Sequence, residues 1–352
     1  MRNRSAGEGP SPLPRFAILG LAVVALFAAD LALGSVRIPL AEVAKALAGR
    51  SENEAWSRIV SIFRLPKALT ATLAGAALAL SGLILQTVFR NPLAGPDSLG
   101  IGAGASVGVA LVVLASGGAG SAFLSGLGPL GYGVLALAAS AGAFLVLAII
   151  LALSRRFEDA VTLLIVGLLV GYVAGSAVSL LVYFGSPQKV SVYLGWNYGS
   201  FSSVTRRELP FLAGSVGLGA ALAARSSKSL NALLLGERFA EGLGVRVRRE
   251  RGRVLLAAAV LAGAATAFCG PVAFLGIAAP QAARRAFRSS DHALLLPASA
   301  LVGAAFALAA DVASQAPGGG TVLPVNPLLA LIGAPIILGL FARGGRAEEG
   351  RP

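Results

Sequence analysis

The sequence is poor in the residues that most enzymes and disulfide-bonded proteins depend on. Its 352 residues include one cysteine, Cys269, and one histidine, His292, and only 13% of them are charged. A single cysteine excludes an intrachain disulfide, and one histidine offers poor material for a nucleophile–base pair. The sequence contains no Walker A loop and no residue cluster with metal-ligand spacing. We therefore expect no catalytic residue, no bound metal and no cofactor held by this chain.

Apolar residues take the place of the missing charges. Hydrophobic residues make up 56% of the chain, and the mean hydropathy is +0.80. A soluble protein carries about 25% charged residues, so this composition predicts an all-α polytopic membrane protein with about ten transmembrane helices. The apolar segments lie near residues 16–34, 68–89, 99–116, 129–153, 160–184, 209–224, 254–270, 272–287, 293–313 and 327–342.

One transmembrane domain is predicted, at residues 16–343, between an N-terminal tail at 1–15 and a C-terminal tail at 344–352. We interpret the first apolar run as a retained helix, because no small-residue cleavage site follows it. Lys and Arg are about twice as frequent on one side, which predicts that both tails and the loop 225–253 are cytoplasmic. The net charge of +13 fits this bias and attraction to membrane lipid, and we expect no nucleic-acid partner. The external loops at 35–63 and 185–208 are interpreted as modest connections.

The most informative stretch begins at two basic residues, Arg64 and Lys67. An uncharged run from Ala68 to Phe89 follows, which is long enough to cross a bilayer. Small residues fill this run, and such residues let helix backbones approach closely in lipid. The sequence at 90–92, Arg-Asn-Pro, then ends the helix, because proline disfavours helical geometry at the residue before it. We expect a tightly packed membrane helix with a polar elbow at its far end.

This stretch resembles the FecCD (BtuC-like) permeases, the membrane subunits of ABC importers for ferric siderophores, haem and cobalamin. The resemblance runs in order over roughly residues 60–342, and it implies a BtuC-like type II ABC importer permease fold. Its elements are Arg64 to Lys67, Gly75 to Gly82, Gln86, Asn91 to Gly100, Asn231 to Val245, Gly270 to Arg284, Asp291-His292, Asp311, and Gly333 to Pro335. Three positions depart from the family pattern: Lys67 and Gln315 replace arginines, and Gln281 replaces a histidine.

The loop at 225–253 is predicted to hold two short amphipathic helices. Ser229 can cap the first, leucines at i, i+3 and i+4 give it an apolar face, and Gly236 forms the corner before the second. An amphipathic element lying on the membrane surface would show the same pattern. The resemblance implies instead a pair of coupling helices that sits in a groove of the ATPase subunit. It assigns this role to Asn231, Leu234, Leu235, Gly236, Glu237, Ala240, Leu243 and Gly244.

The resemblance also implies a cytoplasmic gate and a docking surface. The gate would be formed by Asn91 and Leu93 in the elbow and by Ala160 and Val161, although for the second pair a plain helix stop is an equal alternative. Arg64 and Lys67 would meet acidic residues at the two lobe tips of a binding protein. The alternative for this basic pair is snorkelling to lipid phosphates.

These expectations converge on a permease subunit of an ATP-binding cassette importer that moves a ferric siderophore, or alternatively haem or cobalamin. The resemblance implies a homodimer, two cytoplasmic ATPase subunits that use the ATP, and an extracytoplasmic substrate-binding protein at the bacterial inner membrane. Pairing with a related permease in place of a second copy stays open. An ion-coupled secondary transporter is the main competing class, because such proteins carry ionisable residues inside membrane helices. The candidates, Asp30 and Asp311, lie near helix ends. An intramembrane enzyme is a third class.

Overall fold

The computed structural model describes residues 12–34, 36–115, 130–154, 156, 160–316 and 322–348. All regular elements within these ranges are helices. In chain order they are α1 (Leu13–Ala32), α2 (Leu40–Leu47), α3 (Glu54–Arg58), the π-helical turn η1 (Ile59–Arg64), α4 (Leu65–Val88), the 3-10 turn η2 (Pro96–Leu99), α5 (Ile101–Ala110), the π-helical turn η3 (Leu111–Ala115), α7 (Leu130–Ser154), α8 (Ala160–Tyr183), α9 (Pro187–Asn197), the 3-10 turn η4 (Phe201–Ser203), α10 (Leu209–Arg225), α11 (Ser227–Leu234), α12 (Glu237–Gly242), α13 (Val247–Cys269), α14 (Leu275–Phe287), α15 (His292–Ser314) and α16 (Val325–Glu348).

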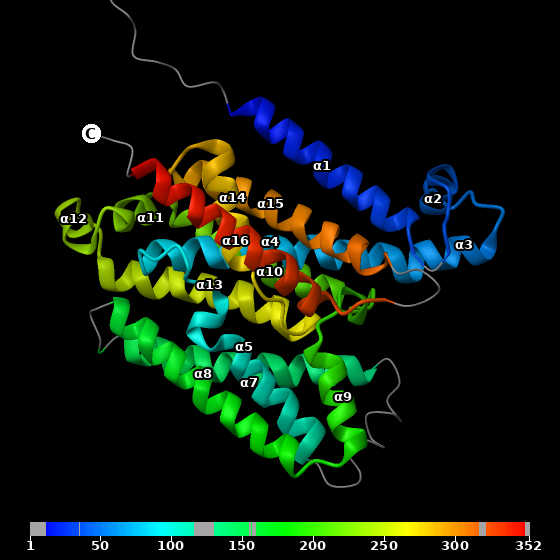
Figure 1. Ribbon diagram of the computed structural model, residues 1–352, viewed down its shortest axis with the longest axis horizontal. Helices are drawn as coiled ribbons and strands as arrows, with labels where there is room; N and C mark the ends of the chain where they lie inside the picture. Colours follow the sequence, from blue (N-terminus) through cyan, green and yellow to red (C-terminus); the bar gives the residue numbers. More distant parts are fainter. Residues whose placement is uncertain are drawn as a thin grey trace, which may run out of the picture.

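The long helices form one bundle with two distinct ends (Figure 1). Helices α11 and α12 lie at one end, which we call the α12 end. Helices α2 and α3 lie at the opposite end, which we call the α3 end. Helix α4 runs between these ends and packs against α13, α14 and α15. This arrangement confirms the predicted all-α fold with a central packed helix.

Each of the ten predicted apolar segments contains a helix, but several of these helices are too short to cross a bilayer. Among the described residues, six helices have the length and hydropathy of a membrane span, and α10 with α11, bent by 58°, would make a seventh. Helix α14 covers only 13 residues and contains Pro280, which removes a backbone hydrogen-bond donor. The predicted number of ten transmembrane helices is therefore not confirmed.

The external loops are more structured than the sequence analysis expected. Helices α2 and α3 occupy much of the region 35–63, and α9 lies within 185–208. The side chain of Asn53 caps α3 by accepting a hydrogen bond from the backbone N–H of Trp56 at 3.1 Å. Pro187 occupies the first position of α9, where its missing N–H is tolerated. These short helices therefore form from local capping signals, although none is long enough to span a membrane.

Glycines set the close approach of α4 to its neighbours. A Cβ on Gly75 would lie 2.3 Å from the carbonyl oxygen of Gly303 in α15. A Cβ on Gly82 would lie 1.6 Å from the carbonyl oxygen of Gly276 in α14. Both distances are shorter than any contact a side chain can make, so the helix backbones touch directly at these crossings. The predicted tight packing of the small-residue run is confirmed.

Helices α1 and α8 lie at the outside of the bundle. Only 11% of the most apolar window of α1 and 17% of that of α8 are buried. Large apolar side chains such as Leu21 of α1 and Val173 of α8 are exposed. In a membrane these faces contact lipid or another subunit.

Candidate functional sites: the coupling loop, the elbow and the outer ion pairs

The loop between α10 and α13 folds into two short helices joined at a glycine corner. Gly236 has φ +117° and Gly244 has φ +82°, so glycine supplies the backbone conformation at the corner and after the second helix. This confirms the predicted corner. The predicted cap at Ser229 is wrong, because α10 ends at Arg225 and α11 already begins at Ser227, with only Ser226 between them.

The loop exposes one set of apolar side chains and buries another. Leu230 is fully buried in the main core of the bundle, and Ala240 is fully buried in a small separate cluster with Ala232, Leu233 and Val247. Leu235, Phe239 and Leu243 are 65%, 52% and 63% exposed, and we call these three residues the apolar knob. Phe239, Ala240 and Leu243 were expected on one apolar face, but Ala240 is buried among Ala232, Leu233 and Val247 while the other two are exposed. An exposed apolar cluster at a polar end of the molecule is typical of a binding surface.

The polar residues of the predicted coupling set are engaged inside the protein. The Nδ2 atom of Asn231 donates to Oδ1 of Asp291 at 2.7 Å, and its Oδ1 accepts from the backbone N–H of His292 at 2.8 Å. Glu237 forms an ion pair with Arg251 at 3.3 Å. Asn231 and Glu237 therefore anchor the loop, and the knob is the part that faces outward. Asp291-His292 is recognisable as a motif in the sequence, but only the fold brings this pair beside Asn231.

Asp291 is also the N-cap of α15. Its Oδ1 accepts a hydrogen bond from the backbone N–H of Ala293 at 3.0 Å in addition to the one from Asn231. The Asn231 amide is the main cause, and the Ala293 N–H the second, of a lowered pKa for the Asp291 carboxyl. The carboxylate is thus held ionised as an acceptor for both donors.

The elbow, residues 90–96, is a defined turn at the end of α4. The Asn91 side chain accepts from the backbone N–H of Leu93 at 2.9 Å, and Arg90 has φ +47°. Gln281 of α14 donates to Gln86 Oε1 at 3.0 Å and to the carbonyl oxygen of Pro92 at 3.2 Å. Gln281, one of the departures from the family pattern, therefore ties α14 to both sides of the elbow.

The predicted gate residues lie on neighbouring elements. Leu93 of the elbow is 52% exposed, and Val161 of α8 is 56% exposed. A Cβ on Gly100, just after η2, would lie 2.9 Å from the carbonyl oxygen of Gly167, so this segment packs directly on α8. Ala160 is the first residue of α8, and the adjacent 157–159 lie outside the described residues. A gating role for the four residues stays a prediction.

At the α3 end, the two basic residues of the predicted docking surface lie mostly buried, and their docking role stays a prediction. Arg64 is only 7% exposed and donates to the carbonyl oxygens of Leu31 and Ala32, each at 2.8 Å, and to that of Val36. The guanidinium thus satisfies carbonyl groups where α1 ends, which a bilayer would otherwise leave without partners.

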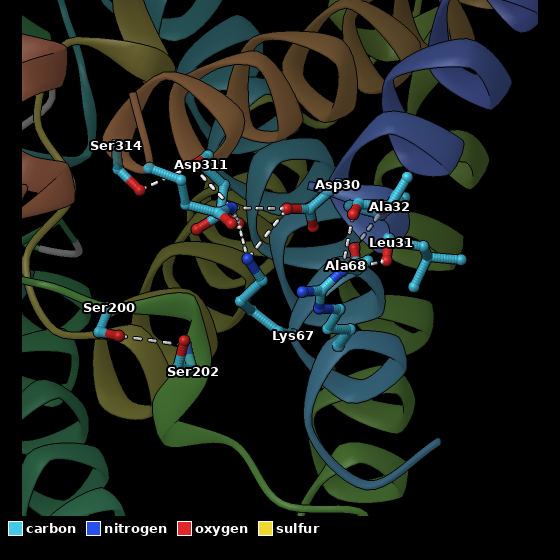
Figure 2. A network of polar contacts seen from close by, with 12 residues as sticks. Asp30, Leu31, Ala32, Lys67, Ala68, Ser200, Ser202, Asp311 and Ser314 are labelled. Atoms are coloured by element: carbon cyan, nitrogen blue, oxygen red, sulfur yellow. Dashed lines mark hydrogen bonds and ion pairs between the residues drawn. The ribbon is translucent and has the colours of Figure 1, made fainter. Parts of the chain in front are cut away.

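Lys67 is mostly buried and takes part in an ion-pair network. Its ammonium lies 3.0 Å from Asp30 of α1 and 2.5 Å from Asp311 of α15, and its side chain is 12% exposed (Figure 2). Gln315 donates to Asp30 at 3.1 Å and to Asp311 at 3.3 Å. The positive charge is therefore compensated within the chain. Both carboxylates are far from Lys67 in the sequence, so only the fold reveals that they meet.

A cavity of about 1260 Å³ opens beside this network at the α3 end. Lys67 and Asp311 lie at its wall, together with the exposed Arg206 and Arg207. Solvent-accessible positive charge at this cavity therefore comes from Arg206 and Arg207 more than from Arg64 and Lys67. Within the described ranges, no group of three or more His, Cys, Asp or Glu residues is arranged to hold a metal ion.

The bundle of long apolar helices defines a polytopic membrane protein, with an exposed apolar knob and a polar elbow after α4. The sequence profile of the FecCD transport family matches residues 21–343, so the chain belongs to this family and the resemblance is confirmed. It is the permease subunit of a type II ATP-binding cassette importer. This finding decides against the ion-coupled transporter and the intramembrane enzyme.

Individual relatives support the same assignment. The chain is 34% identical over 327 residues to the hemin transport system permease protein HmuU of Yersinia pestis, covering 91% of this chain and 94% of HmuU. It is 32% identical over 283 residues to the vitamin B12 import system permease protein BtuC of Escherichia coli, covering 80% and 83%. A solved inward-facing structure of a metal-chelate type ABC transporter superposes with a TM-score of 0.80 at 28% identity, covering 95% of this chain and all of that one.

Proposed function

We propose that this permease imports a metal chelate across the bacterial inner membrane, with a ferric siderophore as the first candidate cargo. Haem and cobalamin are the alternatives, and they gain weight because the two relatives above are named as hemin and vitamin B12 permeases. The observation that carries the coupling part of the proposal is the apolar knob, held out by a glycine corner in a chain of this family. Uptake of labelled ferric siderophore, haem and cobalamin in a strain lacking its own importers would identify the cargo.

The proposed assembly contains two permease copies, two ATPase subunits and a binding protein. The exposed apolar face of α8 offers a surface for the second copy around a two-fold axis. The knob would enter a groove of the ATPase, which places the α12 end and both tails in the cytoplasm. The binding protein would dock at the α3 end. Because Arg64 and Lys67 are compensated, we assign the leading contacts to Arg206 and Arg207, with Lys67 at the wall of the cavity beneath them.

Replacing Gly236 with valine is expected to lower uptake at least about tenfold while membrane insertion stays normal. Valine is strained at φ +117°, so the corner would reorganise and the knob would turn away from the ATPase. Gly242 is a matched control, because a Cβ there meets nothing within 4 Å and its φ is not in the left-handed region. The measurements are copurification of the ATPase and uptake in vesicles. Equal uptake by Gly236→Val and Gly242→Val would contradict the proposal that the apolar knob binds the ATPase.

Cysteines placed at 91 or 93 are expected to crosslink between the two permease copies in one nucleotide state only. The elbow lies at the cytoplasmic end of the proposed pathway, so its distance to the partner copy should change with gating. The background is low because the natural Cys269 is 2% exposed. Leu218→Cys, on the exposed face of α10, is a control that should not respond to nucleotide. Crosslinking that does not depend on nucleotide, or none at all, would contradict the gate.

A further inference from the structure

A continuous chain of hydrogen bonds, part-buried at Asn231 and fully buried at Thr87, connects the coupling loop to the end of α4. Asn231 of α11 contacts the start of α15, where its Oδ1 lies 2.8 Å from the backbone nitrogen and 2.7 Å from the ring Nδ1 of His292. The other ring nitrogen, Nε2, lies 2.7 Å from the hydroxyl oxygen of Thr87 in α4. His292 and Thr87 are fully buried. We call Asn231, His292 and Thr87 the relay.

The surroundings determine which atom donates in each bond. The Asp291 carboxylate only accepts and the His292 backbone N–H only donates, so the Asn231 amide has a single orientation that satisfies both. Its Oδ1 must then accept from His292 Nδ1–H. A neutral imidazole protonated at Nδ1 can make both hydrogen bonds, because its unprotonated Nε2 can accept from the Thr87 hydroxyl. That hydroxyl also lies 2.8 Å from the carbonyl oxygen of Leu83, so two acceptors share one proton.

The relay ends directly beside the elbow. The carbonyl oxygen of Thr87 accepts from the backbone N–H of Arg90 at 3.2 Å, and that of Gln86 accepts from the N–H of Asn91 at 3.1 Å. The last turn of α4, which holds Thr87, thus sets the position of the elbow backbone. Any displacement of Thr87 along the bundle displaces Asn91 with it.

Capping of α15 does not require these bonds. Asp291 already caps the helix through the N–H of Ala293 at 3.0 Å. A helical threonine can also satisfy its hydroxyl within its own helix, as the buried Thr87 does with Leu83 and as the half-buried Thr72 does with Ala68 at 2.8 Å. The bonds from Asn231 to His292 and from His292 to Thr87 are additional, and they join three separate helices. Hydrogen bonds inside a low-dielectric interior are strong, so the three helix ends are held as one rigid unit.

We propose that the relay transmits movement of α11 to the elbow, so that Thr87 and His292 are positioning residues for transport. The proposal rests on the proposed function, in which the ATPase acts on the α11–α12 loop. When the ATPase shifts α11, the relay carries the start of α15 and the end of α4 with it, and the elbow moves. The buried side chains of Leu230 and Leu233 also hold α11 in place, but apolar packing is non-directional and does not fix how α11 moves relative to α15 and α4.

Thr87→Val tests the relay, because valine has the shape of threonine without the hydroxyl. The expected result in proteoliposomes containing the purified ATPase is a loss of about tenfold in cargo transported per ATP hydrolysed, with ATPase binding retained. Thr87→Ser keeps the hydroxyl and should restore the ratio to within about threefold of wild type. Thr72→Val removes a hydroxyl from the same helix outside the relay and should leave the ratio unchanged. The ratio is informative because a purely structural defect lowers the amount of complex and not its coupling.

Two further outcomes would overturn the proposal. An unchanged ratio in well-folded Thr87→Val shows that the hydroxyl does not transmit movement. If Thr87→Val does not fold, the smaller Thr87→Ala replaces it, and an unchanged ratio there has the same meaning. Failure of the proposed function would look different, because Gly236→Val would then retain ATPase binding and uptake. Failure of the relay alone leaves the Gly236→Val defect intact while Thr87→Val transports with the normal ratio.

Discussion

Replacing Gly82 with alanine is expected to destabilise the permease by more than about 3 kcal/mol, the upper end of ordinary overpacking effects. The added Cβ would lie 1.6 Å from the carbonyl oxygen of Gly276 and 2.5 Å from its carbonyl carbon. These are backbone atoms, so no side chain can rotate away, and α14 must move as a whole. Movement of α14 is resisted because a Cβ on Gly276 would itself lie 2.5 Å from Pro96. The crossing has no space on either side.

The measurement is the yield of monodisperse permease in detergent and its apparent Tm. Gly214→Ala in α10 is the matched control, because a Cβ there meets nothing within 4 Å. Alanine at an unobstructed helical position should be neutral or stabilising by about 0.5–1 kcal/mol, because glycine loses more backbone entropy on folding. Equal stability of the two variants would show that the α4–α14 crossing is looser than the structure indicates.

Replacing Lys67 with methionine is expected to destabilise the protein by about 3–5 kcal/mol. The substitution keeps the length and apolar character of the side chain but leaves Asp30 and Asp311 without a cation, and Asp30 is fully buried. Removing one partner of a buried ion pair is costly because the remaining charge is neither hydrated nor compensated. Oδ2 of Asp30 already lacks a hydrogen-bond partner, so no further donor is at hand to stabilise the carboxylate once Lys67 is removed.

A second variant separates the charge effect from loss of packing. The triple change Lys67→Met, Asp30→Asn and Asp311→Asn removes all three charges and should recover most of the lost stability. Lys45→Met is the surface control: Lys45 pairs with Glu42 at 2.7 Å, but its side chain is 55% exposed. Exposed pairs contribute under about 1 kcal/mol, so this change should be nearly neutral. If Lys67→Met changes the apparent Tm no more than Lys45→Met does, the ion pairs of Lys67 with Asp30 and Asp311 do not stabilise the bundle. Apparent Tm in detergent is the readout for all three variants.

The ion pairs of Lys67 and the hydrogen bonds of Arg64 also affect charge-reversal tests of binding-protein docking. Reversing Arg64 and Lys67 to glutamate would break contacts among α1, α4 and α15 as well as any contact with a binding protein. A loss of binding in that variant would therefore not locate the docking surface. Reversal of Arg206 and Arg207 is the cleaner test of the proposed outer contact, because both side chains are exposed. Salt should weaken such a contact, since exposed charges are screened within about 10 Å at 0.1 M ionic strength.

Features that depend on neighbouring residues could be predicted from the sequence. The apolar runs located the long helices, the small residues of α4 indicated close packing, and Gly236 marked the corner of the coupling loop. Local physics decides each of these: helix formation, the helix-ending effect of proline and the positive φ that glycine tolerates. The short motifs were specific enough to predict the family, which the sequence profile confirmed over residues 21–343.

What the sequence alone determined is therefore the class of protein, the course of its main helices and the location of its loop and elbow. The tertiary structure decided which polar groups meet: Lys67 with Asp30 and Asp311, and Asn231 with His292. These partners lie from tens to hundreds of positions apart, and no local rule links residues over that separation. They meet because glycine crossings bring α4 and α15 into contact, and because buried charges and amides must find partners where water is absent.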